Sequence, residues 1–109
     1  MPTITKAPPS EALVAFGHSL VIECQAIGIP PPLIVWRLNW GHIGQPPRIT
    51  TTTDRLESPY GGPTISHGKI VIQSVLKEDE GAYTCEAINS QGNILAVPDT
   101  IVHVIRKLF

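Results

Sequence analysis

The sequence has no concentration of charge of either sign. Eight Lys and Arg residues stand against nine Asp and Glu residues, for a formal net charge of −1, and they are scattered along the chain. A protein that binds nucleic acid or an anionic membrane through a dedicated surface needs a concentrated basic face. The charge pattern therefore argues against nucleic acid and against a membrane surface as partners.

Long hydrophobic runs are also missing. The apolar windows are short, whereas a transmembrane helix needs about 20 apolar residues in succession. The start of the chain, Met1-Pro2-Thr3-Ile4, lacks the apolar segment of a signal peptide. These absences predict either a cytosolic protein or an internal module taken from a longer secreted chain and given a start Met.

No stretch has the length and periodicity of an amphipathic helix. Eleven Pro and nine Gly residues divide the chain into short segments, which is typical of strands joined by tight turns. We therefore predict an all-β fold. A length of 109 residues predicts a single domain over 1–109, with its core within about 3–105 and a linker stub at 106–109.

Catalytic and metal-binding patterns are absent. The four histidines lie in separate predicted turns and strands without ligand spacing: His18, His42, His67 and His103. No serine lies in a nucleophile-elbow sequence. We predict a protein without enzyme activity, metal or cofactor, whose function depends on its surface.

Cysteine is scarce, with two residues 61 positions apart, Cys24 and Cys85. This spacing excludes a CxxC redox or zinc motif. Two buried thiols and one bridge between two sheets both remain open at this point. A bridge closing a loop of this size would contribute on the order of 4 kcal/mol on the chain-entropy model.

Alternating apolar residues predict the strands and the direction of their side chains. We expect strands at 3–6 and 12–16, with a change of pairing partner at the intervening prolines, and further strands at 19–26, 33–39, 50–53, 69–74, 82–89 and 94–105, the last interrupted at Pro98-Asp99. The residues expected to face the core are Leu20, Ile22, Cys24, Ala26, Ile34, Trp36, Leu38, Ile70, Ile72, Tyr83, Cys85, Ala87, Val102 and Val104.

The connecting segments are rich in turn formers. Gly28-Ile29-Pro30-Pro31-Pro32 is expected to be a stiff loop, although a proline run also resembles a docking ligand for aromatic grooves. The segment 54–68 is polar and is expected to be the least ordered region. Leu76 to Glu80 is expected to form a polar turn with one turn of 3₁₀ helix.

The residues expected to face the core carry a family resemblance. Cys24, Trp36 and Cys85 fall on three different strands, and the segment Asp79-Glu80-Gly81-Ala82-Tyr83-Thr84-Cys85 places a tyrosine two positions before the second cysteine. This arrangement resembles the intermediate set of immunoglobulin domains. The segments Val35 to His42 and Gly81 to Asn89 further resemble an immunoglobulin module of the perlecan family, the basement-membrane heparan sulfate proteoglycans.

The resemblance implies a two-sheet Greek-key sandwich with one disulfide, Cys24–Cys85, between its sheets. It implies structural roles for Trp36, which packs on the bridge, for Tyr83, and for Asp79, which is expected to pair with Arg48 or Arg55. It also implies a secreted, extracellular-matrix setting, which fits an excised module. No Ser-Gly pair or Asn-x-Ser/Thr sequon is present, so neither glycosaminoglycan attachment nor N-glycosylation is expected.

Candidate binding residues lie outside the predicted core. Trp40 follows the strand of Trp36 and is expected either to cover a corner of the sandwich or to be an exposed anchor. With it we name as candidate partner-binding residues His42, Arg37 and Arg48. A weak heparin-binding face is expected only if the fold gathers Arg37, Arg48, Arg55 and Lys69. The outward residues of the last strand, Ile101, His103 and Ile105, form another candidate surface.

Two functional classes remain open. In the first, the module binds matrix proteins or cell-surface receptors, with laminin or nidogen as candidates, and contributes to basement-membrane scaffolding. In the second, it is a spacer without a ligand of its own, or a module of a cell-adhesion or intracellular muscle protein. The muscle setting would keep both cysteines reduced. We expect the isolated module to be monomeric.

Replacing the predicted core tryptophan tests this reading. Trp36→Ala is expected to lower the free energy of unfolding by roughly 3–5 kcal/mol, because a large buried side chain would leave a cavity. Chemical denaturation of both proteins measures the difference. A loss below about 1 kcal/mol, the usual size for a surface position, would show that Trp36 lies outside the core.

Overall fold

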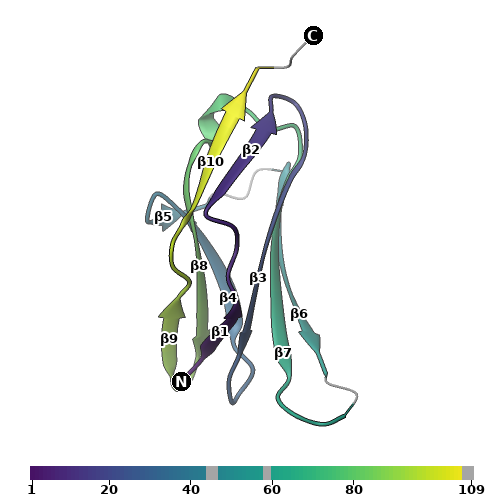
Figure 1. Cartoon of the computed structure of the whole chain (residues 1–109), viewed down its shortest axis with the longest axis vertical. Coiled ribbons are helices and arrows are strands. Elements are labelled where there is room, and N and C mark those ends of the chain that lie inside the picture. The colour runs from purple at the N-terminus through teal and green to yellow at the C-terminus, as the bar shows by residue number, and fades with distance from the viewer. Residues whose placement is uncertain (44–46, 58–59, 107–109) are drawn as a thin grey trace.

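The chain forms two β-sheets that pack face to face (Figure 1) in the computed structural model, which describes residues 1–43, 47–57 and 60–106. One sheet has the order β1-β3-β7-β6, with the strands Thr3–Lys6, Leu20–Ile27, Ile65–Ile72 and Ile49–Leu56. The other has the order β2-β10-β8-β4-β5, with the strands Glu11–Ala15, Thr100–Ile105, Gly81–Asn89, Leu33–Leu38 and Gly41–His42. The predicted all-β sandwich is confirmed.

The first predicted strand does change its partner. β1 pairs with β3 in one sheet, and β2 runs parallel to β10 in the other. Pro8 and Pro9 lie between the two strands, where their missing N–H groups leave no ladder hydrogen bond unmade. The N-terminal segment thereby joins both sheets.

The predicted last strand is present in two parts. β9 (Gly92–Leu95) and β10 both pair with β8, and residues 96–99 between them include Pro98 and Asp99. The expected interruption is therefore confirmed. The expected stub is described only at Arg106, since 107–109 lie outside the described residues, and the single-domain boundaries stay a prediction.

The core lies between the sheets and contains the residues that the alternation predicted. Cys24 of β3 and Cys85 of β8 form a disulfide that joins the two sheets. Trp36 is 4% exposed and pairs in register with Cys85 on the neighbouring strand. Its Nε1 has no hydrogen-bond partner among the described residues, so Trp36 stabilises the core through apolar contact and not through its N–H group.

The expectation for segment 54–68 is wrong at both of its ends. β6 continues to Leu56 and β7 begins at Ile65, and the two strands pair without interruption from Ile49↔Ile72 to Leu56↔Ile65. Backbone pairing between β6 and β7 overrides the polar composition here. Ser66 of β7 also donates a side-chain hydrogen bond to the Pro32 carbonyl at 2.6 Å. Only residues 57–64 connect the strands, of which 58–59 lie outside the described residues.

Asp79 organises the end of the sandwich where the 3₁₀ turn η1 (Lys77–Asp79) precedes β8. Its carboxylate accepts two hydrogen bonds from Arg48, at 2.7 and 3.1 Å, and one from the Leu76 amide at 2.7 Å. The Tyr83 hydroxyl donates to the Asp79 carbonyl at 2.7 Å. Of the two arginines expected as partners of Asp79, Arg48 is confirmed, whereas Arg55 donates to the Pro31 carbonyl.

Gly68 marks a close approach between the sheets. A Cβ atom at this position would lie 2.2, 2.4 and 2.7 Å from side-chain atoms of Ile34. Real Cβ atoms do not come this close to other carbons, so any larger residue would displace β4 from β7. Glycine therefore sets the local separation of the two sheets beside the Cys24 disulfide, because Gly68 pairs in register with Cys24.

The substitution Gly68→Ala tests this packing. It is expected to lower the free energy of unfolding by about 1–3 kcal/mol, the usual cost of overpacking a core. Gly41→Ala is the matched control, since a Cβ there would meet only the Leu38 carbonyl at 3.5 Å. Urea denaturation of both variants measures the effect, and equal losses would contradict the assigned role of Gly68.

We expect the free energy of unfolding to fall at high pH because of Tyr83. Burial raises the pKa of Tyr83 to about 12, and the nearby Asp79 carboxylate adds to the rise. Because the unfolded chain releases this proton near pH 10, the stabilisation is complete below pH 10 and is lost as pH rises toward 12. Denaturation between these pH values measures the decline.

Tyr83→Phe is the control for that measurement. It removes the ionisable hydroxyl together with its hydrogen bond to the Asp79 carbonyl. The variant is expected to be less stable at neutral pH by about 1–3 kcal/mol, because the Asp79 carbonyl loses its buried donor. Its stability should then fall less steeply above pH 10. An equally steep decline in the variant would assign the pH dependence to another group.

Candidate protein-interaction surface

Trp40 projects from a tight turn between β4 and β5. Leu38 and Gly41 pair across the turn, and the two residues between them have positive φ values, 51° for Asn39 and 66° for Trp40. Positive φ at both central positions is the type I′ arrangement. Asparagine adopts this conformation readily, whereas a bulky aromatic residue rarely does. Trp40 is 63% exposed, so the turn holds a strained residue with its indole in solvent.

Asn39 fixes the turn to the neighbouring strand. Its backbone N–H donates to the Ala82 carbonyl at 2.8 Å, and its side-chain Oδ1 accepts a hydrogen bond from the Ala82 backbone N–H at 3.0 Å. Gly81 provides the necessary room, because a Cβ there would lie 2.7 Å from Asn39 Oδ1. The residue before Trp40 is therefore hydrogen-bonded to β8, the strand that contains Cys85. Of the two expectations for Trp40, the exposed position matches the structure.

Arg37 lies on the same hairpin but is held by β8. Its Nε donates to Glu86 Oε1 at 3.1 Å, and Asn93 Nδ2 donates to Glu86 Oε2 at 2.7 Å. The Arg37 side chain is 27% exposed and that of Glu86 only 8%. The guanidinium is thus held partly exposed at the surface and directed toward Glu86, which lies opposite Val35. Register places His42 opposite Arg37, although the His42 side chain lies outside the description.

Arg48 is not part of this surface. Its guanidinium is bound by Asp79, and the hydrogen bond between them raises the pKa of Arg48. The sequence analysis named Arg48 both as a possible partner of Asp79 and as a candidate binding residue, and the structure confirms the pairing with Asp79.

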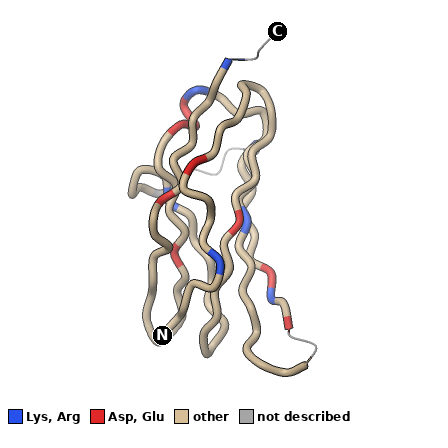
Figure 2. Tube along the Cα trace, viewed as in Figure 1, with Lys and Arg blue, Asp and Glu red and all other residues tan. Residues whose placement is uncertain are grey.

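The four basic residues proposed for heparin are not gathered. Arg37 lies in the sheet of β8, Arg55 and Lys69 lie on β6 and β7 of the other sheet, and Arg48 precedes β6. Arg55 and Lys69 also point to opposite faces of their sheet, since their positions differ in strand parity. Basic and acidic residues alternate over the molecule in Figure 2. The fold therefore does not form a basic face from these four residues.

The outer face of β10 matches its predicted pattern and continues onto β2. Ile101, His103 and Ile105 are exposed, and Val102 and Val104 are buried. Leu13 of β2 lies opposite His103 and is 69% exposed. The sequence analysis did not name Leu13, although the alternation within Glu11–Ala15 would have placed it outward.

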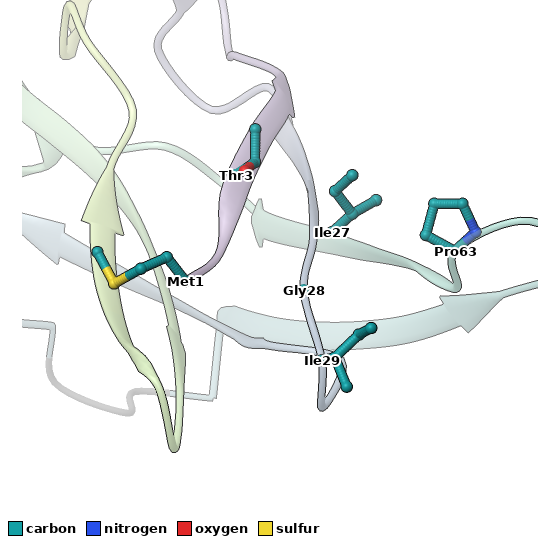
Figure 3. Close-up of a pocket in the computed structure, with 6 residues that line it drawn as sticks. All are labelled: Met1, Thr3, Ile27, Gly28, Ile29 and Pro63. Carbon is teal, nitrogen blue, oxygen red and sulfur yellow. The ribbon is translucent and has the colours of Figure 1, made fainter.

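An apolar hollow of 280 Å³ lies at the N-terminal end of the sandwich. Figure 3 shows its lining residues, Met1, Thr3, Ile27, Gly28, Ile29 and Pro63. None of them carries a charged side chain. Within the described residues, no group of three His, Cys, Asp or Glu side chains is arranged to hold a metal ion. No described helix has the length and hydropathy required to cross a bilayer.

Comparison with known proteins gives consistent matches. Residues 1–89 match the family model described as immunoglobulin domain. The mouse basement membrane-specific heparan sulfate proteoglycan core protein is 40% identical over 106 residues, which are 96% of this chain and 3% of that protein. The basement membrane proteoglycan of Caenorhabditis elegans is 40% identical over 104 residues, 95% of this chain and 3% of that protein.

Two further matches come from other settings. Neural cell adhesion molecule L1.1 of Danio rerio is 35% identical over 108 residues, 94% of this chain and 8% of that protein. The structure of titin domain M7 is similar with a TM-score of 0.79 over 95% of this chain and 93% of that chain, at 19% identity, which supports the fold alone.

The chain thus spans only a small part of the curated relatives it matches, and it aligns with one module of each proteoglycan over nearly its whole length. The resemblance to immunoglobulin modules of the perlecan family is confirmed, and a relation to a cell-adhesion immunoglobulin protein is present as well. On the family model and on its disulfide-linked sandwich, the chain belongs to the immunoglobulin domain family.

Proposed function

We propose that this module binds a matrix protein or a cell-surface receptor through the Trp40 turn and thereby contributes to basement-membrane scaffolding. The observation that carries the proposal is the indole of Trp40, exposed at 63% on a backbone held in a left-handed conformation. Exposed tryptophan and arginine are the residues most enriched at energetic centres of interfaces. Arg37, on the strand that leads into the turn, supplies a partly exposed arginine on the same hairpin.

Preorganisation makes this turn suited to binding. The hydrogen bonds between Asn39 and Ala82 fix the turn before any partner arrives. Glu86 likewise fixes the Arg37 guanidinium through Nε, which leaves its terminal N–H groups for a partner carboxylate or carbonyl. Each prearranged side chain avoids an ordering cost of about 0.5–1.5 kcal/mol on association. The role is one of recognition, with no catalytic step.

The proposed setting is extracellular, in the basement membrane. Two observations support it: the relatives named as basement-membrane proteoglycans and the disulfide between Cys24 and Cys85. Disulfides persist in oxidising compartments and are rare in the cytosol of most organisms. We further propose that 1–109 acts as one domain and that laminin and nidogen are the first partners to test.

A spacer role is the second candidate, and a specific observation favours it. The molecule measures 49 × 28 × 25 Å, and the N-terminus and the end of β10 lie at opposite ends of its long axis (Figure 1). Neighbouring modules would then be separated by nearly the full length of the sandwich. Such a module sets distance and stiffness without a ligand of its own.

Binding by a Trp40 variant separates the two roles. The module is expected to bind laminin, nidogen or a matrix receptor, and Trp40→Ala is expected to weaken that binding by at least about tenfold, because truncating an interface anchor costs about 2 kcal/mol or more. Tyr60→Ala is the control, since Tyr60 is an exposed aromatic residue on the loop between β6 and β7. Surface plasmon resonance measures all three proteins.

The outcomes distinguish the proposals. Absence of binding by the unmodified module at high micromolar concentration rejects laminin and nidogen and favours the spacer role. Equal binding by the Trp40 variant and the unmodified module places the interface elsewhere. Heparin, tested in parallel, is expected to bind weakly and to dissociate as salt rises, because its candidate residues are separated.

A further inference from the structure

β6 is the open edge of the four-stranded sheet. It pairs with β7 and, among the described strands, with no other. Its eight residues read Ile-Thr-Thr-Thr-Thr-Asp-Arg-Leu, and all except Ile49 and Thr53 are exposed. Threonine is a strong strand former, and a long edge strand presents a row of backbone groups to which another strand can pair.

The hydrogen-bond ladder shows which backbone groups point to the open side. The Gln73 amide donates to the Arg48 carbonyl at 2.8 Å, one position before the Ile49↔Ile72 pair. In an antiparallel ladder, hydrogen-bonded pairs alternate with pairs that exchange no bonds. Residues 50, 52, 54 and 56 therefore bond to β7. The peptide groups of the alternate residues point away from β7: Ile49, Thr51, Thr53 and Arg55.

The other edges are protected by the devices common to natural sheets. β1 has four residues between Pro2 and Pro8, and its pairing with β3 is irregular between Ile4 and Lys6. β2 has five residues and follows Pro9, and β5 has two. β6 contains neither proline nor lysine, and its register with β7 has no bulge. Of the described edge strands, β6 is the longest, and it has no proline, lysine or bulge to limit pairing.

We propose that β6 pairs with β6 of a second copy of this chain, antiparallel across a two-fold axis at Thr52. The four-stranded sheets of the two copies then form one continuous sheet. Paired residues must lie on the same face of that sheet, so the two-fold axis must pass through a residue. The axis at Thr52 pairs 49 with 55, 51 with 53, and 50 with 54. All four outward peptide groups of each copy are then hydrogen-bonded.

The number of backbone bonds and the absence of opposed like charges select this register. With the axis at Thr52, the Thr50 hydroxyl of one copy faces the Asp54 carboxylate of the other, and no like charges are opposed. An axis at Asp54 would oppose two carboxylates directly, which is unfavourable. An axis at Thr53 would leave the outward peptide group of Ile49 without a partner in β6. The pairing of Thr52 with Thr52 thus combines full bonding with compatible side chains.

The association is expected to be weak. Contact confined to one strand pair buries less surface than a stable interface requires, about 1,200 Å² or more. The module is then monomeric when dilute, as the sequence predicts, and pairs at the high local concentrations of an assembled matrix. The edge and the Trp40 turn are different structural elements, because β6 and the β4–β5 hairpin belong to different sheets.

Sedimentation equilibrium tests the pairing. From about 10 μM to about 1 mM, the average mass of the unmodified module is expected to rise from 11.8 kDa toward that of a dimer. Hydrogen exchange at the amides of Thr51, Thr53 and Arg55 should slow over the same range. A mass that stays monomeric at all concentrations would overturn the proposal.

Two pairs of variants test the edge and its register. Thr51→Pro removes an outward N–H that bonds to nothing in the sheet, and Thr51→Val is its control. In Thr52→Glu the new carboxylate lies opposite Lys69 of its own chain, which stabilises the monomer. In the dimer the same substitution places two carboxylates opposite each other at the axis. Thr50→Lys is its control, since it would face Asp54 of the other copy.

Thr51→Pro and Thr52→Glu are expected to weaken dimerisation at least about tenfold, while Thr51→Val leaves it unchanged and Thr50→Lys maintains or strengthens it. Urea denaturation checks that each variant is folded. If Thr51→Pro unfolds, Thr52→Glu decides alone. Unchanged dimerisation of the folded Thr52→Glu variant would reject this register, and unchanged dimerisation of both variants would reject the edge.

Discussion

The covalent link between β3 and β8 is the constraint on which the rest of this sandwich depends. It joins the middle of one sheet to the middle of the other, between Cys24 and Cys85. Gly68 lies opposite Cys24, and Trp36 lies opposite Cys85, so the smallest and the largest side chains of the core flank the link. Sheet separation, indole packing and the position of β8 are thus set together.

β8, which contains Cys85, also positions the polar contacts along its length. At its start, Asp79 and Tyr83 bind the segment before β6 through Arg48, and Ala82 holds the Trp40 turn through Asn39. Farther along, Glu86 orients Arg37. The residues proposed for recognition are therefore positioned by the strand that is itself fixed by the disulfide. A rigid scaffold presents a small number of exposed groups, as in many interaction domains.

Much of the fold could be predicted from residue periodicity, because alternation in Leu20 to Ala26 or in Thr100 to Ile105 reports directly which side chains are buried. Hydrophobic periodicity did not predict the strands whose formation depends on cross-strand pairing and not on burial of side chains. The strand expected at 50–53 is present, but its continuation through Asp54 to Leu56 and the Ile65–Gly68 part of β7 have little hydrophobic pattern, yet they form a regular ladder with each other. The polar composition of residues 54–68 gave no indication of this pairing.

The candidate surface was less accessible to prediction, for the same reason. Trp40 was identifiable as an aromatic residue beyond a strand, but its exposure follows from a backbone conformation that only the Asn39–Ala82 contact fixes. Glu86 was not named from the sequence, yet it is buried and hydrogen-bonded to Arg37 and Asn93. Pairing partners from distant parts of the chain determine which polar groups remain available, and no local pattern contains that information.

The parallel pairing of β2 with β10 has a mechanical consequence for a module within a longer chain. β2 lies near the beginning of the chain and β10 near its end, and the two run side by side from Glu11↔Ile101 to Ala15↔Ile105. Tension on the two ends pulls these strands in opposite directions along their common axis. Their hydrogen bonds are then loaded in shear and must break together, so this short ladder resists extension collectively and not one bond at a time.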